Sequence, residues 1–507
     1  MAVFSCKKSL LFYKKFKVQS SKFKVFSYLC SMKRKVFLIG LLLLQYCLPQ
    51  WGEGRKVLPP NPFGHALVPD MIADASILLI GDTFYCYATT DGYGRGLETS
   101  GPPVVWKSKD FVNWSFEGTY FPSAEQEKYW APSKAVKARS WYIYPTVNGY
   151  MHVGVSDSPD GPFRLAKGED KFTKPYAEAA TLLQTGDRRG IDAEVFVDDD
   201  GQAYAFWGGR HVAMLADDMM TLGEVQTLET RRKEYSEGPI FFKRQGIYYY
   251  LYTIGGDENY EYYYMMSRTS PLGPYEVPAH DLVSTTCVER GVFGPGHGCV
   301  FNDGDNYYFA FLEFGRNSTN RQTYVNKLEF NNDGTIKPVR VTLDGVGALR
   351  NTKSRKPLKP VAITASSTKE PMLIRYFNDK RCQRTEHFVP EYVIDGANGS
   401  RWMAEEKAPH SSPEGDTNVQ KGNDAWLMLD LGRERMINQS ELCFVRPTAG
   451  HAYVLEGSRD GKSWEMCGGH SDVQKRSPHI DKPGRKYRYL RVTITEGVCG
   501  VWEWRVF

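Results

Sequence analysis

Three carboxylic acids stand at equivalent places in a repeated sequence pattern, an arrangement that suits general acid–base catalysis. The pattern is a turn followed by an aromatic strand, and it begins at Asp82, Ser140, Gly201, Gly246 and Asp305, with spacings of 58, 61, 45 and 59 residues. Eight to ten residues before these turns stand, in order, Asp74, Trp130, Asp192, Glu237 and His297. Hydrolysis by general acid–base catalysis needs one group that gives a proton and another that takes one.

The spacing of the pattern is that of a β-propeller blade. The segment 191–209, IDAEVFVDDDGQAYAFWGG, is typical of one blade hairpin, with an alternating strand, an acidic turn and an aromatic strand. The first strand of each blade lines the central channel, so the five positions should converge on one axis. Because unpaired buried carboxylates are costly, packing alone would favour apolar residues there. The pattern therefore predicts a catalytic funnel.

The sequence predicts an all-β protein with two folded domains. Residues 55–345 contain short strands and turns with almost no helical periodicity and predict a five-bladed β-propeller. Residues 346–360 are basic and contain proline, as in an interdomain linker. Residues 361–507 contain alternating strands at turn spacings that are typical of a β-sandwich.

Residues 1–54 predict a targeting region, with the true start at Met32. A basic stretch after Met32 precedes an apolar run over 36–44, as in a secretory signal, and this run is too short for a membrane span. We therefore expect a secreted, periplasmic or cell-surface protein. The residues before Cys47, Leu-Gln-Tyr, make a poor lipobox, which disfavours a lipid anchor there.

The charge of the chain does not indicate a nucleic-acid surface. The formal net charge is +5, but residues 1–54 alone hold ten Lys or Arg and one Glu, so the remainder is slightly acidic. Seven scattered cysteines follow residue 54, an odd number that is not a disulfide framework. The absence of CxxC and HExxH motifs disfavours a zinc site.

The motifs ADASI, YWAPS, IDAEVFV, SEGPIF and GPGHGCVF make the region from about 59 to 345 resemble glycoside hydrolase family 43. That family comprises five-bladed propeller glycosidases, inverting in mechanism, that act on arabinose-, xylose- and galactose-containing polysaccharides. The resemblance implies that Asp74 is the general base and Glu237 the general acid. It implies that Asp192 modulates the pKa of the acid and orients it. His297 matches a central histidine that in some members helps to hold calcium or another ion.

Three departures from the family pattern weaken any inference about the substrate. Ala75 follows Asp74 where the family usually has proline, and Ala193 and Glu194 follow Asp192 where it often has Pro-Ser. The WAPD motif ends here in Ser133. None of these changes removes a catalytic group. For substrate binding we single out His297, Trp130, which equally suits core packing, and Arg321, which follows the aromatic strand of the fifth repeat.

The second domain resembles the discoidin-like, coagulation factor 5/8 type C modules that serve as carbohydrate-binding domains. The matching stretches are ASST, IDGANGSRW, LMLDLG, EGSRDGKSWE and RYLRVTITEG. The resemblance implies a β-sandwich of the galactose-binding-like jelly-roll type. Its motifs mark the scaffold and a structural cation loop rather than a sugar site. No cofactor is required by the expected reaction, and a structural calcium ion is compatible with both domains.

These observations predict a secreted inverting glycoside hydrolase, exo-acting and of the α-L-arabinofuranosidase or β-xylosidase type, with a polysaccharide or oligosaccharide substrate. Inversion needs an acid and a base about 6.5–9.5 Å apart, a spacing that side chains on different blades can meet. Alternatives are a non-catalytic glycan-binding protein, an endo-arabinanase or galactan-directed hydrolase on the same fold, and a retaining hydrolase with carboxyl groups about 5–5.5 Å apart.

Overall fold

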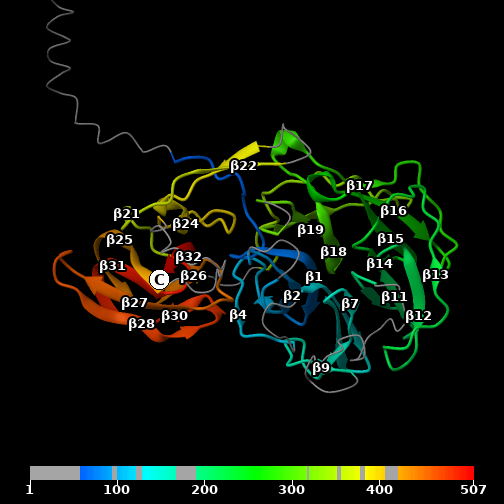
Figure 1. Cartoon of the computed structure of the whole chain (residues 1–507), viewed down its shortest axis with the longest axis horizontal. Helices are drawn as coiled ribbons and strands as arrows, with labels where there is room; N and C mark the ends of the chain where they lie inside the picture. Colours follow the sequence, from blue (N-terminus) through cyan, green and yellow to red (C-terminus); the bar gives the residue numbers. More distant parts are fainter. Residues whose placement is uncertain are drawn as a thin grey trace, which may run out of the picture. The chain divides into compact units, whose positions relative to one another are not determined.

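The computed structural model describes residues 58–93, 100–121, 128–166, 190–316, 319–350, 355–376, 383–405 and 421–507. The predictions for residues 1–54, including the secretory signal and Cys47, lie outside this range. Pro59–Phe507 form one compact unit, built from strands with turns and short 3-10 helices between them (Figure 1). The all-β prediction is confirmed. No helix in the described part of the chain is long and apolar enough to cross a membrane.

Five antiparallel sheets follow one another along the chain, and each is one blade of a propeller. The first two blades are β1 (Ile72–Ile80), β2 (Thr83–Thr90) and β3 (Val105–Ser108), then β5 (Tyr129–Lys137), β6 (Ser140–Val147), β7 (Tyr150–Met151), β8 (Gly154–Ser156) and β9 (Arg164–Leu165). The third is β10 (Glu194–Val197), β11 (Ala203–Trp207), β12 (His211–Leu215) and β13 (Gln226–Thr227). The last two are β14 (Ile240–Arg244), β15 (Ile247–Ile254), β16 (Glu261–Ser267) and β17 (Leu282–Ser284), then β18 (Gly296–Asp303), β19 (Asn306–Glu313) and β20 (Gln322–Leu328).

Apolar clusters fill the junctions between neighbouring blades and close the ring. Each of the five junctions, including that between the fifth blade and the first, has its own buried cluster. Between the third and fourth blades, Phe206 stacks on Phe241 with ring centroids 4.2 Å apart. Such strands are covered on both faces, which is why β15 is aromatic or aliphatic at nearly every position. The five-bladed propeller is confirmed.

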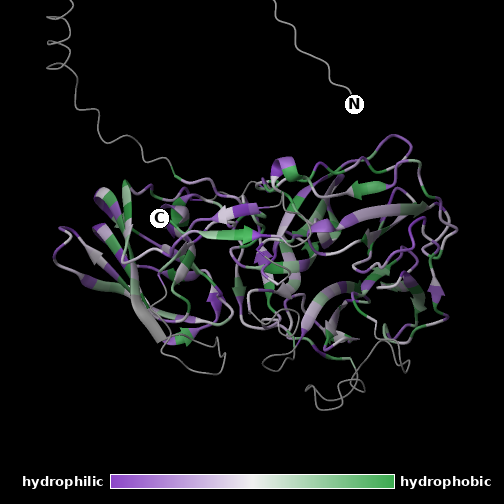
Figure 2. Cartoon of the chain, turned by 45° about the horizontal axis from the view of Figure 1, so that its top comes forward, coloured by the Kyte–Doolittle hydropathy of each residue, from purple (hydrophilic) through white to green (hydrophobic). Residues whose placement is uncertain are grey.

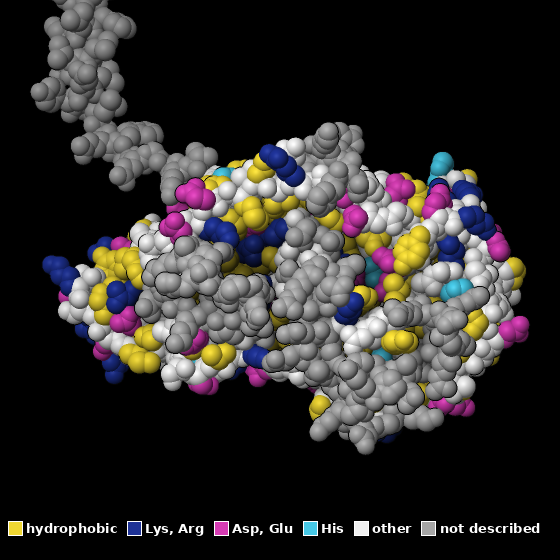
Figure 3. Space-filling model, in the orientation of Figure 1, with side chains coloured by type: hydrophobic (Ala, Val, Ile, Leu, Met, Phe, Trp, Pro, Cys, Tyr) yellow, Lys and Arg dark blue, Asp and Glu magenta, His cyan; other side chains and the backbone are white. Residues whose placement is uncertain are grey.

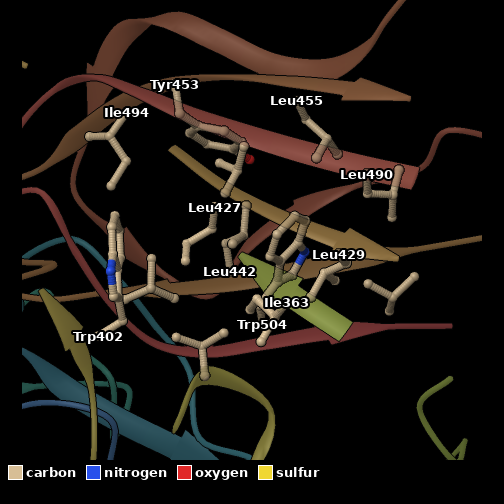
Figure 4. Close-up of a cluster of buried hydrophobic side chains, with 14 of the residues drawn as sticks. Ile363, Trp402, Leu427, Leu429, Leu442, Tyr453, Leu455, Leu490, Ile494 and Trp504 are labelled. Atoms are coloured by element: carbon tan, nitrogen blue, oxygen red, sulfur yellow. The ribbon is translucent and has the colours of Figure 1, made fainter. Parts of the chain in front are cut away.

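The C-terminal region is a sandwich of two sheets. The larger has the order β21 (Ala362–Ala365), β25 (Lys421–Ile437), β31 (Arg485–Glu496), β27 (His451–Ser458) and β28 (Glu465–Gln474). The smaller has the order β24 (Trp402–Met403), β32 (Gly500–Val506), β26 (Ser440–Phe444) and β30 (His479–Asp481). Leu427, Leu429 and Leu490 of the larger sheet pack with Leu442 and Trp504 of the smaller (Figure 4). Hydrophobic and hydrophilic stretches share single strands, as this one-sided burial requires (Figure 2). The sandwich prediction is confirmed.

Buried ion pairs join the sandwich to the propeller. Arg316, which follows β19, donates to Glu386 of β23 (Gln383–Glu386) at 2.6 Å, and Arg401 donates to the same carboxylate at 3.1 Å. Arg384 of β23 donates to Glu313 of β19 at 2.6 Å. All five side chains are buried. Since buried charges are stable only with close partners, these contacts fix the sandwich against the propeller.

Backbone contacts strengthen the same junction. β4 (Phe116–Glu117), which lies between the first two blades in sequence, pairs antiparallel with β29 (Arg476–Ser477) of the sandwich. β22 (Met372–Arg375) pairs antiparallel with β23. In the predicted linker, the amide of Leu349 donates to Asp110 at 3.0 Å, and that of Leu358 donates to Val506 at 2.7 Å. The two described ends of that segment therefore lie against the propeller and the sandwich.

Candidate active site

A left-handed residue recurs at the start of four blades. Asp74 lies in a bulge of β1 with φ 53°, and Asp192 lies two residues before β10 with φ 60°. The second and fourth blades have Ala131 with φ 42° and Gly238 with φ 54°. We expected the alternating strand of segment 191–209 to include Asp192, and this was wrong, because the strand begins at Glu194. A left-handed non-glycine residue costs about 1–2 kcal/mol, and such strain persists where neighbouring structure determines the conformation.

These kinks bring Asp74 and Asp192 to one histidine. His297 Nδ1 lies 3.6 Å from Oδ1 of Asp74 and 3.7 Å from Oδ2 of Asp192, and the three side chains are about 10% exposed. They come from the fifth, first and third blades. A Cβ atom at Gly238 would lie 2.7 Å from Cγ of His297, so glycine is needed there for the imidazole to reach the axis. The predicted convergence of these positions is thus seen in the structure.

Threonines at the ends of the aromatic strands hold the kinks in place. Thr89 Oγ1 donates to Oδ2 of Asp74 at 2.6 Å and accepts a hydrogen bond from the amide of Ala131 at 2.8 Å. Thr146 Oγ1 accepts a hydrogen bond from the amide of Asp192 at 3.0 Å. Each threonine therefore links its blade to the next. We did not identify these residues from the sequence, although the strands TFYCYATT and SWYIYPTV both end near a threonine.

Among the carboxyl groups of the site, Asp192 has the clearest shift in pKa. Burial raises its pKa well above the ordinary value, and the nearby charges of Glu237 and Asp74 raise it further. The amide of Gly238 donates to Oδ2 of Asp192 at 3.1 Å and opposes this shift. From the sequence we expected the charge of Asp192 to help Glu237 keep its proton. The repulsion between the two carboxyl groups contributes to the raised pKa of Asp192, and the expected help to Glu237 stays a prediction.

Glu237 is half-buried and is oriented by two tyrosines. Tyr260 donates to Oε1 of Glu237, and Tyr235 donates to Oε2 at 2.9 Å. The backbone of Glu237 is fixed as well, since its amide donates to Thr253 Oγ1 at 3.0 Å. Tyr260 is buried, whereas Tyr235 is 65% exposed. In Figure 3, histidine and acidic side chains (cyan and magenta) lie together in a hollow of the propeller bordered by hydrophobic side chains.

Arg321 bridges Asp74 and a buried carboxylate that we did not identify from the sequence, Asp91. The amide and Nε of Arg321 both donate to Oδ2 of Asp91 at 2.9 Å, and Nη2 donates to Oδ1 at 3.1 Å. Both terminal nitrogens lie 3.5 Å from Asp74. Burial acts to lower the pKa of Arg321, but the charges of Asp74 and Asp91 outweigh it and raise that pKa. Arg321 therefore stays a cation beside Asp74.

Trp130 occupies the corresponding place on the second blade. It is half-buried on β5, pairs with Thr146 of β6, and directly precedes the left-handed Ala131. Nζ of Lys128 lies 6.0 Å from the centre of its ring. Its position beside Ala131 is compatible with either of the roles considered from the sequence, a sugar platform or core packing.

Two of the departures from the family pattern meet in space. Ser133 Oγ donates to Oε2 of Glu194 at 2.8 Å, and both side chains are buried. The family pattern has an acid where Ser133 stands and often a serine where Glu194 stands, so carboxyl and hydroxyl have changed places. Burial raises the pKa of Glu194, while Lys134 and the Ser133 hydroxyl oppose this shift. The second and third blades thus keep a polar contact near the axis.

The ion that the resemblance allowed beside His297 stays a prediction. Among the described residues, no group of three or more His, Cys, Asp and Glu side chains is arranged to hold a metal ion. His297 faces two carboxylates at ion-pair distances.

The propeller and its carboxylate-lined axis define a class of protein, the hydrolases that cleave glycosidic bonds by acid–base catalysis. Residues 61–336 match the protein-family model described as glycosyl hydrolases family 43, and residues 362–505 match that of the F5/8 type C domain. The chain therefore belongs to glycosyl hydrolase family 43, and it is a glycosidase.

Three similar proteins illustrate the relationship. The chain is 29% identical over 338 residues to beta-D-galactofuranosidase xynD of Aspergillus niger, covering 60% of this chain and 93% of that protein. It is 27% identical over 321 residues to arabinoxylan arabinofuranohydrolase of Paenibacillus polymyxa, covering 53% of this chain and 48% of that protein. A solved structure described as a glycoside hydrolase is 60% identical, with a TM-score of 0.83, and covers 89% of this chain and 100% of that one.

Proposed function

We propose that the protein is a secreted, inverting exo-glycosidase that removes a terminal α-L-arabinofuranosyl or β-D-galactofuranosyl residue from a polysaccharide or oligosaccharide. The observation that carries the proposal is the division of the site into two parts. Asp74 is held as a base among Thr89, His297 and Arg321, while Glu237 is oriented on another blade by Tyr235 and Tyr260.

In the proposed reaction, Asp74 is the general base. Arg321 and Thr89 orient its carboxylate, which takes a proton from a water molecule. The water oxygen forms a bond to the anomeric carbon from the face opposite the leaving group. The bond from that carbon to the glycosidic oxygen breaks, and Glu237 gives its proton to this oxygen. Proton exchange with solvent then restores both carboxyl groups.

The sugar is proposed from the relatives and from stereochemistry. One relative is named a β-D-galactofuranosidase and another an arabinoxylan arabinofuranohydrolase. α-L-Arabinofuranose and β-D-galactofuranose share the same ring configuration, and galactofuranose carries one more hydroxymethyl group at C5. A site that recognises the common ring could accept both sugars. We rank β-xylosidase activity below these two.

The surroundings of the catalytic domain complete the proposal. The basic and apolar pattern after Met32 supports export from the cytoplasm. The match of residues 362–505 to the F5/8 type C domain supports a role for the sandwich in binding glycan. A calcium ion in the cation loop of that sandwich remains part of the proposal.

The test is hydrolysis of nitrophenyl glycosides by the chain from residue 55 onwards. The panel contains α-L-arabinofuranoside, β-D-galactofuranoside, β-D-xyloside and β-D-galactoside, followed by oligosaccharides from arabinan, xylan and arabinogalactan. Asp74→Asn and Glu237→Gln should each lower kcat at least about 1,000-fold on the accepted furanoside. Asp200→Asn, in the exposed turn of the third blade, is the control and should leave it unchanged. Glycan binding without hydrolysis of any member would instead support the glycan-binding alternative.

A further inference from the structure

The sandwich reaches the catalytic base through one short segment, Asp91–Gly92–Tyr93. This segment follows β2 of the first blade, and Asp91 anchors Arg321 by three hydrogen bonds. The amide of Asp91 donates to the carbonyl of Met71 at 2.9 Å, and the amide of Gly92 donates to that of Thr319 at 2.9 Å. The segment thus lies at the seam where the ring closes, directly behind the arginine that faces Asp74.

Two side chains of the sandwich hold this segment from outside the propeller. Arg446, in the turn between β26 and β27, donates to the carbonyl of Gly92, and its guanidinium lies 5.1 Å from the ring centre of Tyr93. The hydroxyl groups of Tyr93 and Thr448 are 2.6 Å apart, and Thr448 is buried. Both contacts are made within two residues of Asp91. A movement of this turn would therefore displace Asp91, which holds Arg321 in place.

The backbone and the packing of the turn that carries Arg446 place its side chain against the Asp91 segment. Arg446 has a left-handed backbone with φ 55°, a conformation that costs an arginine about 1–2 kcal/mol. Beneath it, Cys443, Val445 and Trp502 of the sandwich form a buried cluster with Met71 of the propeller. The carbonyl of Met71 is the one that accepts the amide of Asp91. Apolar packing and polar contacts therefore fix the same segment from the same domain.

We propose that Arg446 is a positioning residue for catalysis, which acts through Gly92 and Asp91 to set Arg321 beside Asp74. The proposal rests on the proposed function, in which Asp74 is the base. It makes the sandwich a structural part of the catalytic centre, in addition to any part it has in binding glycan. A sandwich tethered only by a linker would have no such effect.

The first test compares Arg446→Ala with Arg476→Ala. Both arginines belong to the sandwich and contact the propeller, but Arg476 pairs with Glu117 of β4, in a different loop from the Asp91 segment. We expect Arg446→Ala to lower kcat about 10- to 100-fold with little change in KM, because misplacement of a catalytic group by about 1 Å has effects of this size. Arg476→Ala should keep kcat, and Arg446→Lys should recover part of the loss. Equal kcat in the two alanine variants would overturn the proposal.

Hydrogen exchange provides a readout that does not depend on activity. In Arg446→Ala we expect faster exchange of the amides of Asp91, Gly92 and Arg321, each of which is hydrogen-bonded at the seam. Exchange that changes only in the turn around 446–450 would overturn the proposal even if no substrate were found. If the wild-type chain hydrolyses no substrate but Arg446→Ala still shows faster exchange at the seam, the proposed function is rejected. The contact by which Arg446 positions Asp91 is then retained.

Discussion

Ser133 and Glu194 form a buried hydrogen bond of 2.8 Å between the second and third blades, from positions where the family pattern has an acid and often a serine. The pair retains one carboxyl group and one hydroxyl group, with their places exchanged. Two substitutions that each look anomalous in the sequence are thus explained by one contact. The contact also bears on the site, since Glu194 follows Asp192 by two residues.

The exchange predicts strong coupling between the two positions. Ser133→Asp alone would place two buried carboxyl groups together and should lower the free energy of unfolding by about 2–4 kcal/mol. Glu194→Ser alone would remove the acceptor and should cost about 1–3 kcal/mol. The double variant Ser133→Asp/Glu194→Ser should lie within about 1 kcal/mol of the wild type. Urea unfolding of the four proteins measures the coupling, and additive effects of the single changes would refute it.

The two tyrosines that donate hydrogen bonds to Glu237 should contribute unequally to activity. Tyr260→Phe removes a buried donor to Oε1 and should lower kcat about 10- to 100-fold, because the acid is then poorly oriented. Tyr235→Phe should have a smaller effect, since Tyr235 is 65% exposed and solvent can replace its hydroxyl.

The matched control for these variants is Tyr263→Phe. Tyr263 lies on the same blade, and its hydroxyl donates to Glu261 at 2.6 Å rather than to the candidate acid. Its kcat should equal that of the wild type. Equal losses in all three phenylalanine variants would mean that the tyrosines act only through the stability of the fourth blade.

The buried ion pairs at the junction predict that propeller and sandwich unfold together. Glu386→Gln leaves Arg316 and Arg401 buried without a charged partner, which should lower the free energy of unfolding by about 3–5 kcal/mol. Calorimetry should show a single transition at a lower temperature. Glu276→Gln, which breaks the exposed pair with Arg268, should leave the midpoint where it is. A second transition that moves alone would show that the domains unfold independently.

Asp70 predicts a loss of stability as pH rises. This carboxyl group is 3% exposed, its Oδ2 has no hydrogen-bond partner among the described residues, and burial raises its pKa to about 7 from 3.8. Between these values the folded state binds the additional proton, so the free energy of unfolding falls as pH rises from about 4 to about 7. The full penalty, up to about 4 kcal/mol at about 1.4 kcal/mol per pKa unit, is present above pH 7.

Asp70→Asn removes this titration. Its midpoint of thermal unfolding should match that of the wild type near pH 4 and exceed it increasingly towards pH 8. The difference between the two midpoints isolates Asp70, because all other titrating groups are common to both proteins. A difference that does not change with pH would show that Asp70 is ionised in the folded protein throughout this range.

The repeat made the centre of the site predictable from the sequence. The proximity of Asp74, Asp192 and His297 could be predicted because the blade period places equivalent residues around one axis. Arg321 could be singled out because it follows the last repeat. Asp91 and Tyr260 could not be found in this way. Both lie in connections between strands, where no period relates one blade to another, and their positions are set by tertiary contacts. The contact between Arg446 and Gly92 joins two domains and has no local signal either.

In the proposed function, Asp74 and Glu237 act as base and acid on opposite sides of a bound sugar. The most direct test is proton NMR of the first product released from nitrophenyl α-L-arabinofuranoside, or from the β-D-galactofuranoside if that is the better substrate, recorded before mutarotation. We expect the inverted anomer first, β-L-arabinofuranose or α-D-galactofuranose, and no product from Asp74→Asn or Glu237→Gln on the same time scale. A first product of retained configuration would contradict it, because retention requires a covalent glycosyl intermediate on a carboxylate nucleophile.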